Sequence, residues 1–344
     1  MDFLTISPER GYYDNEILNS SGNLYRVKAS TPKWKYFSWI KIKIRLLMLY
    51  INILRGNKYQ ALHVHGTGGT GLLFLFIGKL YRVNVRIIHN HGIPESYKPT
   101  LLNSIVRYIK KLSTDIISTH KLGCSKKICE FYFGKNCFND SRTAVIRNGI
   151  DLEKFSNVYK KGYVKTKYSI PEEKYNFIHV GRFSKEKNQI FLIRMFAELC
   201  KLRSDVHLTI IGYGLLEKEI KEEIHIKGID RNISFLPQDS FIPEVMSAMN
   251  FFVLPSLNEG LGIVLIEAQA MGLPCFVSSA VPNEADLGMC MYYPLNKGEK
   301  YWANVINESI DKKSYKSSID NKKLSMFDIR STASIMAKIY CEET

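Results

Sequence analysis

The strongest constraint on the fold is a regular alternation of short apolar runs and longer amphipathic stretches between residues 175 and 278. The apolar runs are rich in β-branched and aromatic side chains, which is typical of buried strands. They fall at Tyr175–Val180, Val206–Ile211, Ile233–Leu236, Phe251–Leu254 and Cys275–Ser278. Helices are predicted between them, at Gln189–Leu202, over a charged stretch up to Lys227, at Ile242–Met249 and over 262–272. Strands that alternate with helices form parallel crossovers, so this segment predicts a doubly wound α/β sheet.

The first 150 residues show the same alternation less regularly. Strands are predicted at Phe3–Ile6, Ala61–Val64, Val85–Ile88, Lys121–Cys124 and Ala144–Ile146. A basic helix is predicted over Trp34–Leu54, because its apolar residues recur at helical spacing. The polar stretch 151–167 separates the halves, and a length of 344 residues is typical of two domains. We therefore expect an N-terminal domain over residues 1–155 and a C-terminal domain over 156–325.

Charge is distributed unevenly between the two halves. Residues 1–150 contain 23 Lys+Arg and 8 Asp+Glu, a net charge of +15, whereas the remainder contains 25 of each kind. This excess favours an anionic partner: nucleic acid, an acidic membrane surface or a phosphorylated substrate. No apolar run approaches the roughly 18 residues of a membrane span, and no signal peptide is expected. The seven cysteines show neither metal-ligand spacing nor a disulfide framework, so we interpret them as cytosolic thiols.

The segment PSLNEGLGIVLIEAQAMGLP at 255–274 is the most informative motif. Gly260 and Gly262 permit a tight turn and close approach of a ligand, and a helix is predicted to begin near Gly262. The free amides and dipole of a helix N-terminus suit a diphosphate. Glu267, about one turn into the helix, can accept hydrogen bonds from hydroxyls beside the phosphate, while Glu259 lies farther out on the loop. The alternative is a helix-start glutamate and a surface glutamate without a ligand.

A second motif, GRFSKEKN, follows the strand Tyr175–Val180. Arg182 and Lys187 can neutralise a leaving diphosphate, although a solvated surface position is the commoner fate of a basic residue. Because both motifs follow strands of one predicted sheet, we favour phosphate binding. The sequence contains no Asp-x-Asp metal motif, so we expect chemistry that uses neither a metal nor a cofactor.

Together with IIGYG and VIRNGIDLEKF at 145–155, these motifs resemble glycosyltransferase family 4. Its members are retaining enzymes with two Rossmann-like domains that face a cleft, the GT-B fold. The resemblance implies that Glu259 contacts the donor sugar, that Glu267 contacts the ribose, and that Arg182 and Lys187 hold the diphosphate. It also implies that the base lies near Pro237 and Gln238. The further donor-binding residues that it implies are Gly181, Gly212, Gln238, Gly260, Leu261 and Gly262.

In the N-terminal half, RIIHNHG places His89 and His91 after a strand, and the pair resembles the acceptor-side histidine loop of the family. Imidazole there can hydrogen-bond the transferred sugar or the incoming hydroxyl, and His91 is the preferred catalytic residue. A structural role for both is the alternative. HVHGTGGTG at 63–71 adds Gly68 and Gly69 as acceptor-side candidates. The closing FDIRSTASIMAKIY resembles the last helix of the family, so residues 326–344 are expected to pack back on the first domain.

One departure from the family concerns the first domain. Family members open with a strand, a glycine-rich loop and a helix, whereas Phe3–Ile6 here resembles the second strand. We therefore expect the N-terminal domain to lack its first strand–loop–helix unit.

VPNEADLG and SPERGYYDNEI resemble bacterial transferases of capsular and exopolysaccharide assembly. The first hypothesis is metal-independent, retaining transfer from a nucleotide sugar, with UDP implied by the resemblance. The acceptor would be a glycan or an undecaprenyl-diphosphate-linked sugar. The second hypothesis is a truncated sugar-nucleotide-binding protein with weak or no turnover. A nucleic-acid partner is not expected, because no nucleic-acid-binding motif accompanies the basic half.

The basic helix also suggests a membrane surface. Its aromatic and basic residues are Lys33, Trp34, Lys35, Phe37, Trp39, Lys41, Lys43 and Arg45. A helix of this composition can lie in a membrane interface, and anionic lipids add about 1 kcal/mol per nearby basic residue. We therefore expect a cytoplasmic protein, peripheral on the inner face of the cell membrane. The alternative is a core helix with solvated lysines.

Overall fold

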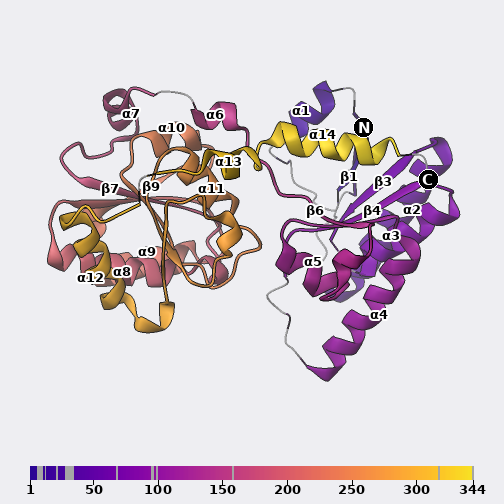
Figure 1. The fold of residues 1–344 in the computed structure, drawn as a ribbon, viewed down its shortest axis with the longest axis horizontal. Helices are drawn as coiled ribbons and strands as arrows, with labels where there is room; N and C mark the ends of the chain where they lie inside the picture. The colour runs from indigo at the N-terminus through magenta and orange to yellow at the C-terminus, as the bar shows by residue number, and fades with distance from the viewer. Residues whose placement is uncertain are drawn as a thin grey trace.

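The computed structural model describes residues 1–5, 11, 13–20, 22–27, 35–66, 69–93, 97, 100–156, 159–316 and 318–342, with the backbone alone over 35–40. Two α/β domains lie side by side, and the last helix lies along the first of them (Figure 1). Both main sheets consist of parallel strands, which confirms the predicted α/β class.

The C-terminal sheet has six parallel strands in the order β12-β11-β10-β7-β8-β9. They are β7 (Tyr175–Val180), β8 (Val206–Ile211), β9 (Ile233–Leu236), β10 (Phe251–Leu254), β11 (Cys275–Ser278) and β12 (Cys290–Tyr293). The first five coincide with the predicted strands, and β12 adds an edge that the pattern does not reveal. Successive strands run outward from β7 on one side and from β10 on the other. The β7–β10 boundary is therefore the topological switch point, where ligands bind beyond the carboxyl ends of such strands.

Helices cover both faces of this sheet. They are α8 (Gln189–Leu202), α9 (Glu217–Lys227), α10 (Ile242–Ser247), α11 (Ile263–Ala270) and α12 (Glu299–Asp311). Neighbouring residues of one strand serve opposite faces: Phe251 packs in the cluster that includes α8, α9 and α12, and Phe252 in the cluster that includes α10 and α11. Burial on both sides explains why the strands read as continuous apolar runs. The stretch expected as a polar connection contains two short helices, α6 (Leu152–Ser156) and α7 (Lys161–Tyr168).

The N-terminal domain contains a four-stranded parallel sheet in chain order. Its strands are β3 (Ala61–His65), β4 (Val85–Asn90), β5 (His120–Gly123) and β6 (Thr143–Val145), and its helices are α2 (Lys35–Gly56), α3 (Gly69–Leu80), α4 (Leu101–Ile117) and α5 (Lys126–Phe133). Three short elements, β1 (Phe3–Thr5), α1 (Asp14–Asn19) and β2 (Leu24–Arg26), precede them. In the described residues β1 and β2 pair only with each other, apart from the main sheet. The expected lack of a first strand–loop–helix unit stays a prediction.

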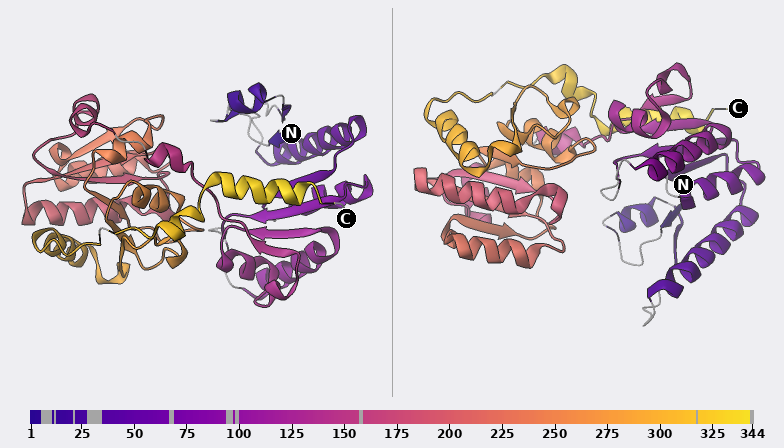
Figure 2. Two further views of the ribbon diagram at one scale, coloured as in Figure 1. Left: turned by 45° about the horizontal axis from the view of Figure 1, so that its top comes forward. Right: turned by 90° about the horizontal axis from the view of Figure 1, so that it is seen from below.

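The last helix, α14 (Ile329–Tyr340), follows the short α13 (Asn321–Ser325) and lies on one face of the N-terminal sheet (Figure 2). Met336 and Ile339 share a buried cluster with Val85, Ile87 and Ile146. Helices α3 and α5 pack on the opposite face. Both faces of this sheet are therefore covered by helices.

The chain passes between the domains twice, and the two passages are joined. The Ile150 N–H donates to the carbonyl of Phe327 at 2.7 Å, and the Ile329 N–H donates to the carbonyl of Ile150 at 2.9 Å. The resulting parallel bridge pairs Ile150 with Asp328.

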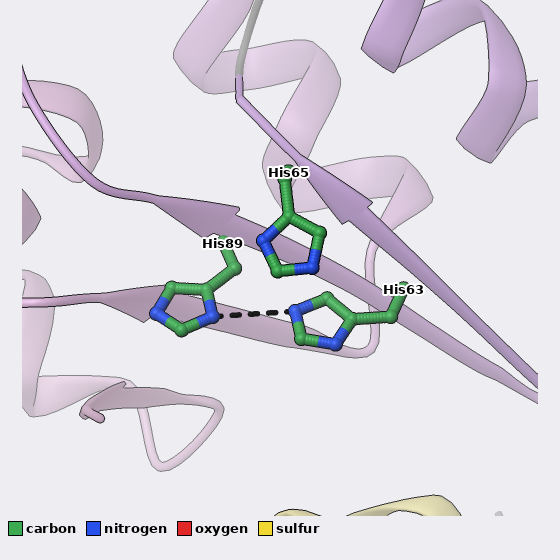
Figure 3. Close-up of side chains that lie close together, drawn as sticks. All are labelled: His63, His65 and His89. Carbon is green, nitrogen blue, oxygen red and sulfur yellow. Dashed lines mark hydrogen bonds between the residues drawn. The ribbon is translucent and has the colours of Figure 1, made fainter. Parts of the chain in front are cut away.

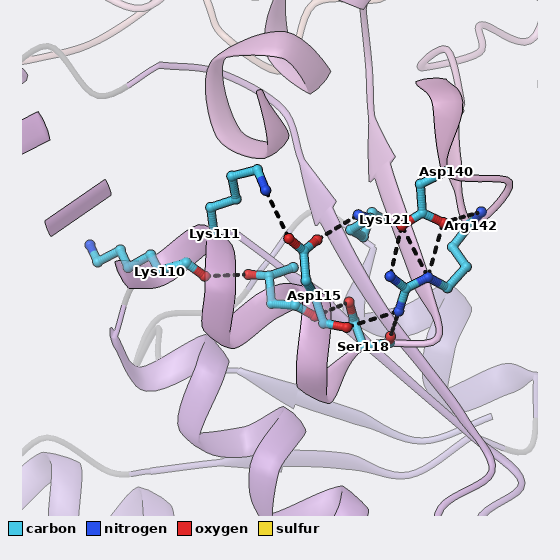
Figure 4. A network of polar contacts seen from close by, with 8 residues as sticks. Lys110, Lys111, Asp115, Ser118, Lys121, Asp140 and Arg142 are labelled. Carbon is cyan, nitrogen blue, oxygen red and sulfur yellow. Dashed lines mark hydrogen bonds and ion pairs between the residues drawn. The ribbon is translucent and has the colours of Figure 1, made fainter. Parts of the chain in front are cut away.

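Helix α4 is attached to the sheet through charged groups. Asp115 pairs with Lys121 of β5, with Nζ 2.6 Å from Oδ1, and Lys121 also pairs with Asp140 at 2.8 Å (Figure 4). The Lys121 side chain is only 4% exposed, so this network lies on the inner side of the helix. The exposed positions of α4 are mostly apolar: Leu101, Leu102, Ile105, Val106, Tyr108, Ile109, Leu112 and Ile116. The helix is thus anchored by charge on the inside and apolar on the outside.

Candidate active site

The loops that follow β7 and β10 meet at the switch point of the C-terminal sheet. Lys187, in the first loop, has its Nζ 2.6 Å from Oε1 of Glu259 in the second. The Ser256 hydroxyl donates to the same carboxylate oxygen at 2.7 Å. The side chains of Lys187 and Glu259 are 21% and 9% exposed, so this ion pair is largely shielded from water. Two predicted donor residues are therefore in direct contact, although 72 positions separate them.

Arg182 is exposed just beyond β7, and its side chain has no ion pair within the part of the chain that the structure describes. Its carbonyl accepts a hydrogen bond from Nε2 of Gln189 at 2.8 Å. The same amide nitrogen lies 3.2 Å from Nε2 of the buried His179, whose Nδ1 lies 2.9 Å from the carbonyl of Val253 in β10. Burial lowers the pKa of His179 to about 4. The neutral ring can donate to Val253 and accept from Gln189, which fixes the loop of Arg182 relative to β10.

The glycine turn after β10 leads directly into α11. Gly262 has a φ of +83°, a conformation that favours glycine, and precedes the first helical residue, Ile263. No side chain caps this helix, so its first amides are free of a side-chain acceptor. Leu261 is buried in the domain core and anchors the turn. The helix therefore begins where the sequence predicts, and anion binding by its first amides stays a prediction.

Glu267 lies one turn into α11 and is partly buried. In the described residues its carboxylate forms no hydrogen bond and no ion pair. Burial raises its pKa to about 7. Because an unpaired carboxylate in such a place is unfavourable when ionised, Glu267 can gain from hydroxyl donors of a ligand.

The N-terminal domain touches this site through the loop after β4. A Cβ atom at Gly260 would lie 2.3 Å from the carbonyl oxygen of His91, so only glycine allows the two backbones to approach this closely. His91 is exposed, with Nδ1 3.0 Å from Oδ1 of Asn148 and Nε2 2.8 Å from Nδ1 of His65. The structure thus brings His91 against the loop that carries the donor motif.

The other donor-side candidates lie at the same edge of the C-terminal sheet. Gly181 and Gly212 directly follow the paired ends of β7 and β8, and Gln238 is exposed in the turn after β9. Their contacts with a nucleotide stay predictions.

The other acceptor-side candidates are placed less uniformly. His89 is only 5% exposed, and its Nδ1 lies 3.2 Å from Nε2 of His63, inside the domain. Gly69 is exposed at the start of α3, whereas Gly68 lies outside the described residues. An acceptor role for these three residues stays a prediction.

Sequence reasoning missed three members of this site. His179 and Gln189 lie in a predicted strand and a predicted helix, and Asn148 belongs to the VIRNG segment. The sequence signal for His179 is its place within the apolar run YNFIHV. A buried imidazole ring needs a hydrogen-bond partner, so a histidine there indicates a polar contact inside the core.

The sequence of this chain matches a known protein family and its members. The family model of the glycosyl transferases group 1 matches residues 163–287, which include both donor motifs. EpsF of Bacillus subtilis (strain 168), named as a glycosyltransferase, is 31% identical over 313 residues, which cover 89% of this chain and 78% of EpsF. The chain belongs to the group 1 glycosyltransferases. This confirms the resemblance to glycosyltransferase family 4 that the motifs indicate.

Two further relatives specify polysaccharide chemistry in their names. The UDP-Gal:α-D-GlcNAc-diphosphoundecaprenol α-1,3-galactosyltransferase of Escherichia coli is 32% identical over 261 residues, 72% of this chain and 64% of that enzyme. The capsular polysaccharide biosynthesis glycosyltransferase CapH of Staphylococcus aureus is 26% identical over 308 residues, 86% of this chain and 80% of CapH. The group 1 transferase described here is therefore similar to both enzymes over most of its own length.

A solved structure agrees on the fold. The crystal structure of Anabaena HepE with UDP and glucose has a TM-score of 0.75, covers 98% of both chains, and shares 16% sequence identity. Similarity at this level concerns the fold, and it confirms the predicted GT-B architecture.

Proposed function

We propose that this glycosyltransferase moves a sugar from a UDP-sugar to a lipid-diphosphate-linked sugar or glycan, with retention and without a metal at the donor, in capsule or exopolysaccharide assembly. The observation that carries the proposal is the meeting of Lys187, Glu259 and the uncapped N-terminus of α11 at one switch point. HepE supports the choice of UDP, because it was solved with UDP and glucose. The named acceptor of the Escherichia coli relative supports a lipid-linked sugar.

The diphosphate has three sources of positive potential. Arg182 is exposed and free of ion pairs within the described chain, Lys187 follows it in the same loop, and α11 contributes free amides and a dipole. Together they can stabilise the charge that develops on the leaving UDP, which is usually the largest catalytic contribution. This is the role that a metal ion plays in other transferases, so the residues fit a donor site that works without one.

Two carboxylates complete the donor site. Glu267 accepts hydrogen bonds from the ribose hydroxyls, which compensates its burial. Glu259 accepts from hydroxyls of the transferred sugar once the diphosphate attracts Lys187 away from it. A carboxylate held by Lys187 and Ser256 is already oriented for this contact.

The chemical step is a front-face substitution. The acceptor oxygen forms a bond to the anomeric carbon on the face from which UDP departs, and the bond from that carbon to the phosphate oxygen breaks. The proton of the acceptor hydroxyl passes to the departing phosphate oxygen. His91 lies against Gly260 and can orient the acceptor hydroxyl or the sugar through its imidazole.

We also infer that the N-terminal domain docks on the anionic, cytoplasmic face of a membrane, where such acceptors reside. Helix α4 presents its apolar face outward, and all of the excess positive charge belongs to residues 1–150. Helix α2, which the sequence predicts as the membrane contact, is partly core. Tyr50 and Leu54 are buried, although Ile44 and Met48 are exposed. Trp34 and the side chains of Phe37 and Trp39 lie outside the described residues. Among the described helices, none has the length and apolar character to cross a bilayer.

The decisive experiment is a transfer assay with purified protein, a panel of UDP-sugars and lipid-diphosphate-linked sugars, with and without EDTA. We expect turnover that EDTA does not abolish. We also expect NMR of the product to show a new linkage with the same anomeric configuration as the donor sugar. UDP binding without transfer to any acceptor would favour the second hypothesis, a sugar-nucleotide-binding protein without turnover. Inversion of configuration would overturn the front-face step.

A further inference from the structure

A cluster of histidines lies at the carboxyl edge of the N-terminal sheet. The parallel register of β3 and β4 sets His65 directly beside His89, and His63 precedes His65 by two residues. Side chains two apart on a strand point to the same face. His63, His65 and His89 therefore project together from one face of two neighbouring strands (Figure 3), and His63 contacts Tyr340 of α14.

The three rings approach one another at ligand distance. One ring nitrogen of each lies within 4.8 Å of a ring nitrogen of both others. His63 Nε2 and His89 Nδ1 are 3.2 Å apart. Two imidazole nitrogens bound to one tetrahedral zinc ion are separated by about 3.3 Å, because each Zn–N bond is about 2.0–2.1 Å long. The backbone therefore sets the side chains at a spacing that one metal ion can bridge.

The outer nitrogens of two rings already have partners. His63 Nδ1 lies 2.7 Å from the hydroxyl of Tyr340, and His65 Nδ1 lies 2.8 Å from Nε2 of His91. These contacts leave Nε2 of His63 and of His65 for another ligand. A metal-bound histidine normally uses its second nitrogen in such an outer hydrogen bond, which orients the ring.

The surroundings of the cluster also suit a metal. His89 is buried and His65 is exposed, so an ion would have a dry side and an access route from solvent.

We propose that His63, His65 and His89 form a binding site for a zinc-type transition-metal ion, with a fourth position open to water. Three imidazoles with an open position are an established ligand set for zinc. The site goes beyond the donor chemistry proposed above, which uses other residues. Through the Tyr340–His63 contact an ion would fix α14 on the sheet, and through the His65–His91 contact it would fix the acceptor-side loop.

The alternative for the same residues is a hydrogen-bonded array of neutral imidazoles without a metal. The two can be distinguished by titrating chelator-treated full-length protein with Co²⁺ and Zn²⁺. We expect one Co²⁺ per chain, with the visible absorption bands of a four-coordinate ion, and displacement by Zn²⁺. His63→Gln and His89→Gln should each weaken binding at least about 100-fold, and Tyr340→Phe about 10-fold, as expected for an outer-shell partner.

His120→Gln is the matched control, because His120 lies in the same sheet but pairs with Glu342 away from the cluster. This variant should bind Co²⁺ as the wild type does. Absence of a stoichiometric site in the wild type at micromolar metal, or equal binding by His63→Gln and wild type, would overturn the proposal. If both cluster variants fail to fold, NMR of the wild type decides instead. Addition of Zn²⁺ should then shift the signals of the histidine ring nitrogens, and unchanged signals would overturn the proposal. UDP titration calorimetry on the metal-free protein keeps this result separate from that of the donor site.

Discussion

Nζ of Lys187 lies 2.6 Å from Oε1 of Glu259, so a cation assigned to phosphate and a carboxylate assigned to sugar are already paired across the switch point. A diphosphate competes with Glu259 for this ammonium. The two residues therefore differ in which step they serve, and their variants should separate binding from turnover.

Lys187→Ala is expected to weaken UDP binding about 10- to 100-fold, since a charge-assisted hydrogen bond contributes about 1.5–3 kcal/mol. Glu259→Ala should lower kcat about 100-fold while the Kd for UDP stays within about threefold. The reason is that its hydrogen bonds to the transferred sugar act mainly in the transition state. Calorimetry with UDP and a transfer assay measure the two quantities. Equal losses of affinity and turnover in both variants would contradict this division.

Glu267→Ala should weaken UDP binding about tenfold, because the ribose loses a buried carboxylate acceptor. Since the pKa of Glu267 is raised to about 7, hydroxyl donors that favour the ionised form should release a proton when UDP binds near that pH. Calorimetry in buffers of different ionisation enthalpy measures this release, which Glu267→Gln should remove. Unchanged UDP affinity in Glu267→Ala would show that the ribose lies elsewhere.

The same carboxylate should make stability depend on pH. The pKa of Glu267 is about 7 in the folded protein and 4.5 as a free side chain, so the folded state holds the proton more tightly. Its stabilising contribution is complete below pH 4.5 and is lost as pH rises through 7, by about 3 kcal/mol. Urea unfolding at pH 5 and pH 8 should show Glu267→Gln gaining stability relative to wild type as pH rises. A difference that does not change with pH would count against this assignment.

Gly260→Ala should disturb the contact between the domains, because its Cβ would meet the carbonyl of His91 at 2.3 Å. We expect kcat to fall at least tenfold with a smaller change in UDP affinity, since the backbones must separate. Gly162→Ala, in α7 with no atom within 4 Å of the added Cβ, is the matched control and should be neutral or slightly stabilising. Full activity of Gly260→Ala would mean that this contact is not needed.

Vesicle flotation tests the outward apolar face of α4. The wild type should float with vesicles that contain anionic lipid, and less so at high salt. Ile105→Gln with Ile109→Gln should reduce binding at least tenfold, because both side chains are exposed on that face. Ile226→Gln removes a more exposed apolar residue from α9 of the other domain, and this variant should bind normally. If wild type and α4 variant float alike, the membrane contact lies on another surface.

Five of the six strands described in the C-terminal sheet could be predicted from the sequence to the residue, because burial on both faces gives continuous apolar runs that turn residues delimit. Helix α4 was not predicted: its exposed residues are apolar, and they face solvent while Asp115 faces the sheet. A sequence pattern identifies an apolar face without telling what covers it.

The candidate site was predicted as separate motifs, and their contacts were not. The Lys187–Glu259 pair and the approach of Gly260 to His91 depend on strand order and on the relative position of the domains, which no local spacing encodes. His89 is predicted to follow a strand, whereas β4 includes it, and the register of β3 with β4 sets it beside His65. Long-range pairing of strands is the missing information.

The return of α14 to the first domain also bears on when that domain can complete its packing during synthesis. Val85 and Ile87 find part of their packing in Met336 and Ile339, which the ribosome makes about 250 residues later. Domains generally fold as they emerge, N-terminal first. Here α14 can cover its face of the first sheet only after the second domain has been synthesised. We therefore expect that face to stay exposed during this interval, in which a chaperone can bind it.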